Sequence, residues 1–337
     1  MSERILLSHG SGGQVSHDLI RDLFVAYFDN PILLQQTDSA ILEHGMENLA
    51  FTTDSYVIDP LFFPGGDIGK LAICGTVNDL AVAGAVPAYI SVGFIIEEGF
   101  ALEDLERIVV SMKKEAELAG VTIVTGDTKV VDHGKADKLF INTSGIGMLL
   151  KTRRNLSLGR HIIPGDKILV NGTMGDHGIA VMAERENLEL NSTLQSDCAS
   201  LNHLIQDVLS HHKEVKMIRD ITRGGLGTIL CELTKERNFG IAIREEAIPV
   251  DEQVKGVCEI LGLEPLYVAN EGKFLMITGP EEAEAILETI RSNPLGKQAA
   301  VIGEVIDFAQ GQVLMETVIG GKRIIEMLSG EQLPRIC

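Results

Sequence analysis

The chain has 337 residues, of which 45% are hydrophobic and 23% charged, and it contains no tryptophan. This is a globular composition with a core of mainly aliphatic side chains, and the length predicts two domains. Because 29 Lys and Arg stand against 48 Asp and Glu, the formal net charge is −19, which would repel a polyphosphate backbone and argues against nucleic acid as a partner.

Helices and strands alternate along the first half of the chain. Hydrophobic spacing predicts, in chain order, a helix over 16–28, a strand over 49–53, a helix over 68–83, a strand over 88–96, a helix over 102–119, and strands over 121–125 and 139–149. The helix over 102–119 is the clearest, because acids occupy its first turn and Gly120 follows its end.

A polar stretch over 151–166 ends in a Pro-Gly-Asp turn and predicts a linker. Beyond it we expect strands over 167–171, 273–278 and 299–305, and helices over 196–209, 225–237 and 281–292. Both halves therefore predict α/β or α+β layer domains. The predicted division is residues 1–155, residues 156–328, and a flexible, extended tail over 329–337.

Cysteine usage and hydropathy predict a cytoplasmic protein. The five cysteines are far apart and form no CxxC pair, which argues against a zinc site and a disulfide framework. The N-terminus shows no signal-peptide pattern. The most apolar region, residues 71–96, is interrupted by Asn78, Asp79 and Pro87, so it is interpreted as buried core and not as a membrane span.

Two glycine-rich loops precede predicted helices, although the chain has no Walker A motif. One contains Gly12 and Gly13, and the other runs from Arg223 to Gly227. Backbone N–H groups at a helix N-terminus can bind phosphate without a lysine. A tight turn with no ligand is the alternative for each loop.

Several acids occupy positions that suggest a metal site: Asp38, Asp54, Asp79, Asp127 and Asp220. Helix capping is an adequate alternative for Asp127 and Asp220. It fits Asp79 badly, because this carboxylate follows Asn78 inside an apolar helix, where an unpaired charge is costly. Magnesium is bound by a few carboxylates together with substrate phosphates, so acids and glycine loops together predict an MgATP site.

Cys337 differs from the other four cysteines, which lie in apolar helical contexts and are predicted to be core. As the last residue of the tail, its thiol is expected to be exposed and able to reach another site, although a tail cysteine without function is the alternative. His9, His133 and His177 lie near glycines in no metal-binding spacing, and solvated or capping roles are the simpler interpretation.

Five segments together resemble the HypE family, the carbamoyl dehydratases of nickel–iron hydrogenase maturation. They are TTDSYVIDPLFFPGGDIGKLAICGTVNDLAVAG, GDTKVV, RDITRGGLG, ANEGK and the ending PRIC. The resemblance spans essentially the whole chain and extends to an ATP-binding superfamily that includes aminoimidazole ribonucleotide synthetase. It implies an N-terminal domain that dimerises through its sheet, a C-terminal α/β sandwich domain, and ATP in a cleft between them.

The resemblance also implies roles for individual residues. Magnesium and phosphate would be held by Asp38, Asp54, Asp79 and Asp220, with Asn78, Asp127, Gly12 and Gly13 near the nucleotide. Glu271 would be the base that deprotonates the carbamoyl nitrogen, with a simple helix or loop hydrogen bond as the alternative, and Lys129 a phosphate contact. Some family members carry a basic residue after GDTKVV; here that position is His133, with Lys135 two residues later, and which of the two replaces it is open.

The implied reaction is ATP-dependent dehydration of an S-carbamoyl group on Cys337 to a thiocyanate. HypF would supply the carbamoyl group, and a HypC–HypD scaffold would receive the cyanide. Two alternatives are a carrier that only displays a modified Cys337, and a small-molecule kinase or synthetase of the same superfamily. Selenophosphate synthetase is disfavoured because the first glycine loop, HGSGGQ, has no cysteine.

Overall fold

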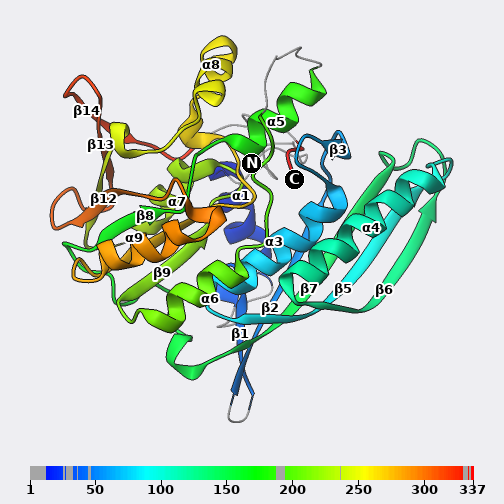
Figure 1. Ribbon diagram of the computed structural model, residues 1–337, viewed down its shortest axis with the longest axis horizontal. Helices are drawn as coiled ribbons and strands as arrows, with labels where there is room; N and C mark the ends of the chain where they lie inside the picture. The colour runs from blue at the N-terminus through cyan, green and yellow to red at the C-terminus, as the bar shows by residue number, and fades with distance from the viewer. Residues whose placement is uncertain are drawn as a thin grey trace.

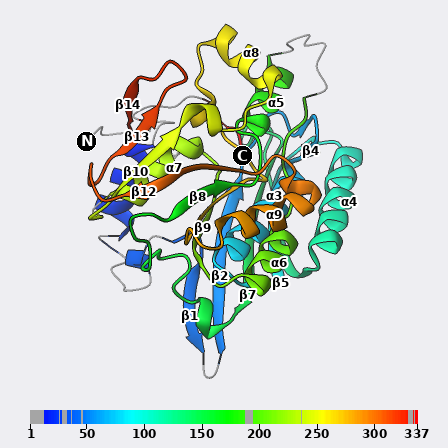
Figure 2. The ribbon, with the colours of Figure 1, turned by 60° about the vertical axis from the view of Figure 1, so that its left-hand side comes forward.

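A computed structural model describes residues 13–25, 27, 33–35, 37–44, 47–186, 194–235, 237–328, 333 and 335–337 of the chain. Its two large sheets lie side by side, with helices packed against them (Figures 1 and 2). Each half of the chain supplies one sheet, so the predicted α/β architecture is confirmed.

The first sheet has five strands in the order β1-β2-β7-β5-β6. They are β1 (Ala40–His44), β2 (Glu47–Tyr56), β5 (Val86–Glu97), β6 (Thr122–Val131) and β7 (Leu139–Leu149). Neighbours are antiparallel except β5 and β6, which are parallel. Burial alternates along β7, as expected for a sheet that is covered on one face only. A short hairpin, β3 (Phe62–Phe63) and β4 (Gly66–Asp67), precedes the first long helix.

Two long helices cover this sheet, α3 (Ile68–Val82) and α4 (Leu102–Ala119), and both confirm predicted helices. α3 begins after Asp67, whose carboxylate accepts hydrogen bonds from backbone N–H groups of the first turn. α4 ends at Gly120, which has a left-handed φ of 73°. Nearly every residue of α3 is buried, so this helix lies inside the molecule and not on its surface.

The second sheet has seven strands in the order β14-β13-β10-β12-β8-β11-β9. They are β8 (Lys167–Val170), β9 (Val215–Asp220), β10 (Gly240–Arg244), β11 (Phe274–Thr278), β12 (Ala300–Ile306), β13 (Val313–Glu316) and β14 (Lys322–Ile325). β10 and β13 are parallel, and all other neighbours are antiparallel.

Helices cover both faces of this second sheet. They are α5 (Asp176–Arg185), α6 (Asn202–His211), α7 (Gly225–Thr234), α8 (Glu252–Leu261) and α9 (Ala283–Ser292). α6 and α9 share a core with Phe274 of β11, whereas α7 shares a core with Leu275, which points to the opposite face. Near the N-terminus, α1 (Gln14–Leu19) continues as a π-helix (Ile20–Val25), and the two together overlap the helix predicted over 16–28 but begin two residues earlier.

α3 joins the two halves of the molecule (Figure 1). Its buried Asn78 donates from Nδ2 to the carbonyl oxygens of Ala199 (3.0 Å) and Glu271 (3.3 Å), and its Oδ1 accepts from the N–H of Leu201 (2.8 Å). Since both amide hydrogens are used, Asn78 binds the two halves together, and its predicted contact with a nucleotide stays a prediction.

Several predicted boundaries were wrong. β2 continues through Asp54 and β6 through Asp127, so both acids lie inside strands and not after them. Residues 194–201 form no regular helix or strand, and α6 begins only at Asn202, because backbone groups of this segment have distant partners such as the Pro64 carbonyl oxygen. α5 and α8 were not predicted. The domain boundary between 155 and 156 stays a prediction.

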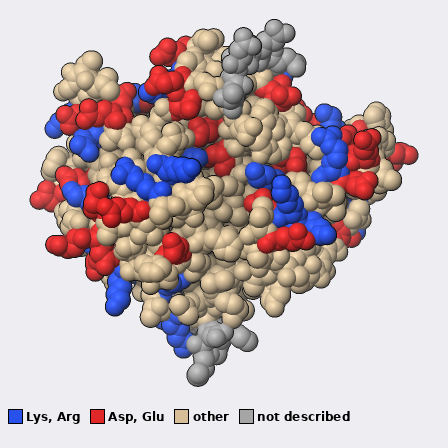
Figure 3. Space-filling view, viewed as in Figure 1, with Lys and Arg blue, Asp and Glu red and all other residues tan. Residues whose placement is uncertain are grey.

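None of the helices in the described part of the chain combines the length and hydrophobicity that a bilayer crossing requires. The face that carries α4, α6 and α9 shows charged side chains of both signs distributed over it (Figure 3).

Candidate functional site

Acids from both halves of the chain meet at the junction of the two sheets. Asp38 precedes β1, Asp79 lies in α3, and Thr52 of β2 lies between them. The Thr52 hydroxyl donates to Asp79 Oδ2 (2.7 Å) and lies 3.1 Å from the Asp38 carbonyl oxygen. Asp220, at the end of β9, and Asp54, in β2, complete this acidic cluster, which we define as Asp38, Asp54, Asp79 and Asp220.

The acids of this cluster repel one another. Burial raises the pKa of Asp79 well above its usual value, and the charges of Asp220, Asp54 and Asp38 raise it further. Burial and the charge of Asp38 raise the pKa of Asp220 to about 7. A positive charge at this place would relieve the repulsion. The structure therefore brings together the four acids that the sequence placed at a metal, without testing that role.

Two residues that the sequence analysis missed adjoin the cluster. Arg219 Nε lies 2.9 Å from Asp38 Oδ2, and its Nη2 lies 3.4 Å from Glu232 Oε2 of α7. Burial nevertheless raises the pKa of Asp38, because removal from water outweighs the attraction of Arg219. Arg219 alternates with buried residues along β9, but the sequence carries no signal for its distant partner Asp38.

Cys337 lies beside the cluster, contrary to the prediction of an exposed thiol. Its residue exposure is 9%, and Ile336 and Cys337 belong to the same core as α3 and α4. The expectation failed because the described end of the tail packs into the molecule by backbone hydrogen bonds, including one from Val57 N–H to the Cys337 carbonyl oxygen (3.1 Å). Whether the tail is also mobile stays a prediction.

The surroundings of the thiol keep it protonated in this position. Burial raises the pKa of Cys337 to about 12, the positive charge of Arg223 opposes that rise, and the charges of Glu271 and Asp54 add to it. The docked thiol is thus a poor nucleophile. Arg223, which is exposed to solvent, interacts electrostatically with Cys337, Asp54 and Glu271.

Glu271 is buried, with 4% exposure, in the loop that leads into β11. Burial, together with the charges of Asp54 and Asp220, raises its pKa well above the usual value. Asp197 fixes this loop, because its carboxylate accepts from the N–H groups of Glu271 (3.2 Å) and Gly272 (3.3 Å). A carboxylate with a raised pKa beside a docked side chain is suited to accept a proton.

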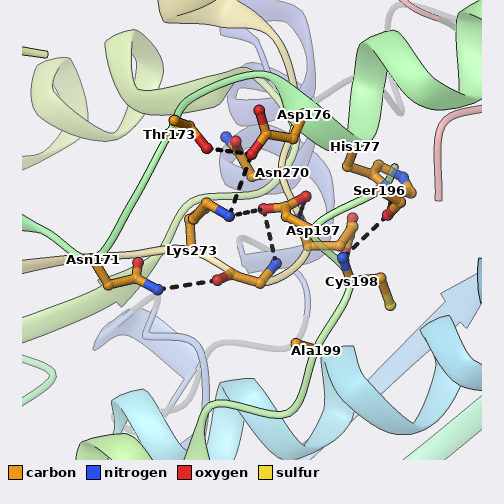
Figure 4. Close-up of polar contacts among 12 residues, drawn as sticks. Asn171, Thr173, Asp176, His177, Ser196, Asp197, Cys198, Ala199, Asn270 and Lys273 are labelled. Carbon is orange, nitrogen blue, oxygen red and sulfur yellow. Dashed lines mark hydrogen bonds and ion pairs between the residues drawn. The ribbon is translucent and has the colours of Figure 1, made fainter. Parts of the chain in front are cut away.

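A second polar network surrounds Lys273 (Figure 4). Lys273 Nζ is 3.2 Å from Asp197 and 3.5 Å from Asp176, and all three side chains are nearly buried. Thr173 makes a short hydrogen bond to Asp176. None of these residues was predicted from the sequence, since no local pattern marks Lys273 and Asp176 as partners.

The two glycine loops differ in what the structure shows. Gly224 and Gly225 have left-handed φ values of 79° and 64° and open α7. The Gly225 N–H donates to the Thr222 carbonyl oxygen (3.0 Å), whereas the N–H groups of Leu226 and Gly227 have no helical carbonyl to bind. A Cβ at Gly225 would lie 2.5 Å from the Leu266 carbonyl oxygen. A Cβ at Gly13 would likewise lie 2.4 Å from the Leu328 carbonyl oxygen. Gly12 lies outside the described residues.

Three predicted site residues are not brought to the cluster. Asp127 and Lys129 form a short ion pair on β6, where both are exposed. His133 is 86% exposed and lies 3.0 Å from Glu97, and Lys135 is exposed nearby. Within one chain these residues do not lie beside the acidic cluster, so their roles in the reaction stay predictions.

The cluster does not form a complete metal site. Within the described ranges, no three His, Cys, Asp or Glu side chains are arranged so that they could hold a metal ion. Its carboxylates are nevertheless the ligands that Mg²⁺ prefers, and Mg²⁺ takes one or two of them together with phosphates and water. The crowded acids of the cluster, of which Asp220 is buried and the other three are partly exposed, therefore fit Mg²⁺ that arrives with a nucleotide.

Comparison with known proteins covers the whole chain. The profile of AIR synthase related protein, N-terminal domain, matches residues 36–149, and that of the C-terminal domain matches residues 164–315. Carbamoyl dehydratase HypE of Rhodobacter capsulatus is 49% identical over 99% of this chain and 98% of its own length.

Two solved structures resemble this chain in both sequence and fold. A crystal structure of hydrogenase maturation protein HypE in complex with ATP has a TM-score of 0.83 at 49% identity, covering 99% of this chain and 100% of that chain. A chain from a HypE–HypF complex has a TM-score of 0.87 at 46% identity, covering 92% of this chain and 99% of that chain.

Proposed function

The chain belongs to the HypE family of carbamoyl dehydratases, as its motifs predicted, and on that premise we propose that it uses ATP to dehydrate an S-carbamoyl group on its own Cys337. The product is a thiocyanate, which supplies cyanide for the iron of nickel–iron hydrogenase. The observation that carries this proposal is the position of Cys337, docked beside Glu271, Arg223 and the acidic cluster.

The reaction balances in two stages. The carboxamide oxygen attacks the γ-phosphorus of ATP, which forms an oxygen–phosphorus bond and releases ADP. The nitrogen then loses its two protons, and phosphate departs with the former carbamoyl oxygen, so that a carbon–nitrogen triple bond remains on sulfur. We assign Glu271 as the group that accepts a nitrogen proton, because burial and neighbouring acids raise its pKa well above its usual value and so make it a stronger base.

The proposed ATP site lies between the acidic cluster and the start of α7. The ATP-bound relative supports nucleotide binding by this fold. The N–H groups that follow Gly224 and Gly225 can bind phosphate at the N-terminus of the ten-residue helix. Mg²⁺, held by one or two of the clustered acids and the phosphates, would neutralise charge on the transferred phosphoryl group.

The docked thiol, protonated and buried, is unsuited to receive a carbamoyl group. We therefore expect the tail to leave the cleft for carbamoylation and to return for dehydration. The HypE–HypF complex of a relative supports HypF as the carbamoyl donor. Transfer of cyanide to HypC–HypD, a homodimer formed through the first sheet, and a cytoplasmic location complete the proposal; five free cysteines support that location.

Intact mass tests this function. The protein is incubated with HypF, carbamoyl phosphate and ATP, then with fresh MgATP. We expect a carbamoyl adduct that next loses one water. Cys337→Ala abolishes the adduct, whereas Cys231→Ala, at a partly exposed cysteine of α7 outside the cleft, keeps both steps.

Two further variants separate the proposed residue roles. Asp79→Ala keeps the adduct and blocks the loss of water. Glu271→Gln slows dehydration more than it weakens ATP binding. A wild-type protein that bears the adduct but neither binds nor hydrolyses ATP would instead be a carrier. Full physiological activity after deletion of the tail would favour a small-molecule kinase or synthetase.

A further inference from the structure

The docked tail is held by one edge of the first half of the chain. Val57 N–H donates to the Cys337 carbonyl oxygen (3.1 Å), and Arg335 Nε donates to the Val57 carbonyl oxygen (3.0 Å). Asp59 N–H lies 3.4 Å from the Arg335 carbonyl oxygen. The two contacts between backbone groups, from the N–H groups of Val57 and Asp59, resemble the addition of a short strand.

The second half of the chain contacts the tail from the other side through α5. His177 Nε2 lies 2.7 Å from the Ile336 carbonyl oxygen, and Arg185 Nη2 donates to the Arg335 carbonyl oxygen (2.7 Å). Two donors of one helix therefore bind successive carbonyl groups of the tail. His177 is fully buried and packs edge-on against Phe63, so its ring has little freedom to turn.

The hydrogen-bond network assigns the tautomer of His177. A carbonyl oxygen can only accept, so Nε2 must carry the proton that faces Ile336. Nδ1 then accepts from the Ser196 hydroxyl (2.7 Å), and Ser196 Oγ in turn accepts from the N–H of Cys198 (3.1 Å). Burial lowers the pKa of His177, which favours this neutral form.

The segment that orients His177 also holds the proposed base. Ser196 bonds to the His177 ring, while the adjacent Asp197 accepts from the N–H groups of Glu271 and Gly272 and pairs with Lys273 (Figure 4). The distance between the last peptide of the tail and Glu271 is thus set by one short stretch of chain.

We propose that His177 is a positioning residue for dehydration: by holding the Ile336 carbonyl, it fixes the last peptide so that the group on Cys337 faces Glu271. This inference rests on the proposed function. A buried hydrogen bond to the docked end of the tail restricts the orientations that the reacting group can adopt, and its loss is expected to slow the reaction about tenfold.

The test compares His177→Ala, His177→Gln and the control His203→Ala. His203 is exposed, and its Nε2 also contacts a backbone carbonyl, that of Leu118 (2.9 Å), away from the cleft. Each protein is carbamoylated by HypF, and the rate of water loss after MgATP addition is followed by intact mass. In unmodified protein, the rate at which iodoacetamide alkylates Cys337 is measured by peptide mass spectrometry.

We expect His177→Ala to lose water about tenfold more slowly and to expose Cys337 to alkylation about tenfold faster, with carbamoylation by HypF undiminished. His177→Gln, which retains an N–H donor, recovers part of both effects, and His203→Ala matches the wild type. Should His177→Ala fold poorly, Ser196→Ala keeps the ring and removes only its orienting hydroxyl, and a smaller change in the same direction is expected.

Wild-type rates of water loss and alkylation in His177→Ala, or in Ser196→Ala if the first variant does not fold, overturn the inference. Slower carbamoylation together with slower dehydration also overturns it, because that pattern indicates general damage. Failure of the proposed function is recognised separately: the wild type would not lose water, while protection of Cys337 by His177 would still be measured by alkylation.

Discussion

Asp79 shows how the requirements of a site conflict with those of stability. Burial and three neighbouring carboxylates raise its pKa, so ionisation at neutral pH opposes folding. We expect Asp79→Asn to raise the free energy of unfolding by about 1–2 kcal/mol at pH 8 in EDTA, since Asn can still accept from Thr52. Denaturant unfolding measures the gain, and ATP-dependent water loss should disappear in the same variant.

The sign of the pH dependence identifies the cause. A raised pKa in the folded state means that wild-type stability from this group is complete below the unfolded pKa and declines as pH rises through the folded pKa. The advantage of Asp79→Asn should therefore shrink from pH 8 to pH 5. The control is Asp127→Asn, at an exposed acid whose pKa is lowered by Lys129, which should show no such gain. A gain that is independent of pH would contradict the electrostatic explanation.

The sequence predicted site residues that have a local signal, and it missed those whose partners lie far away along the chain. The acids stood out locally, because a carboxylate such as Asp79 is conspicuous in an apolar helix. His177 was interpreted as a solvated or capping residue, although it is buried and contacts Ile336, which is 159 positions away. Arg219 and Lys273 were missed for the same reason. Charge in an apolar segment is a local signal, whereas an ion pair between distant segments is not.

At the scale of elements, α3 requires glycine where it passes Tyr56. A Cβ at Gly75 would lie 2.3 Å from Tyr56 Oη, and the Tyr56 side chain is buried in the core that α3 shares with β2. Because this ring cannot move outward without disturbing its neighbours, we expect Gly75→Ala to destabilise the protein by about 1–3 kcal/mol. Denaturant unfolding measures the change.

The matched control is the same substitution in α8. Nothing lies within 4 Å of a Cβ at Gly256, which is inside that helix. Alanine is a better helix former than glycine, so Gly256→Ala should stabilise by about 0.5–1 kcal/mol. If both variants shift stability in the same direction, close packing at Tyr56 is not what requires glycine in α3.

Helices and strands whose limits are marked by nearby residues were predicted correctly, whereas segments fixed by distant contacts were not. α4 has first-turn acids and a terminal Gly120, and its predicted bounds agree with the structure. β7 alternates in burial along its length, and it too was predicted with correct bounds. Residues 196–201 were predicted helical from their hydrophobic spacing, yet Leu201 N–H bonds to Asn78 of α3 instead of a helical carbonyl. Tertiary contacts decided that segment.

At the scale of the whole molecule, the described residues leave one face of the first sheet open. Strand register places Phe51, Ile146 and Tyr89 in one cross-strand row, and each of these side chains is more than a third exposed. At the sheet edge, β6 is exposed along almost its entire length and pairs only with β5 among the described strands. An exposed apolar row beside an unpaired edge is typical of an interface.

This surface explains how chains of net charge −19 could associate as the predicted homodimer. Charged side chains occupy the face that carries α4, α6 and α9 (Figure 3), whereas the row of Phe51, Ile146 and Tyr89 is uncharged. We expect light scattering to give twice the mass of one chain, and Ile146→Glu to give a monomer, because two buried carboxylates would face each other across the interface. Val110→Glu is the control, at an exposed valine of α4 on the opposite side of the sheet. A monomeric wild type, or an Ile146→Glu variant that remains dimeric, would show that this sheet face is not the interface.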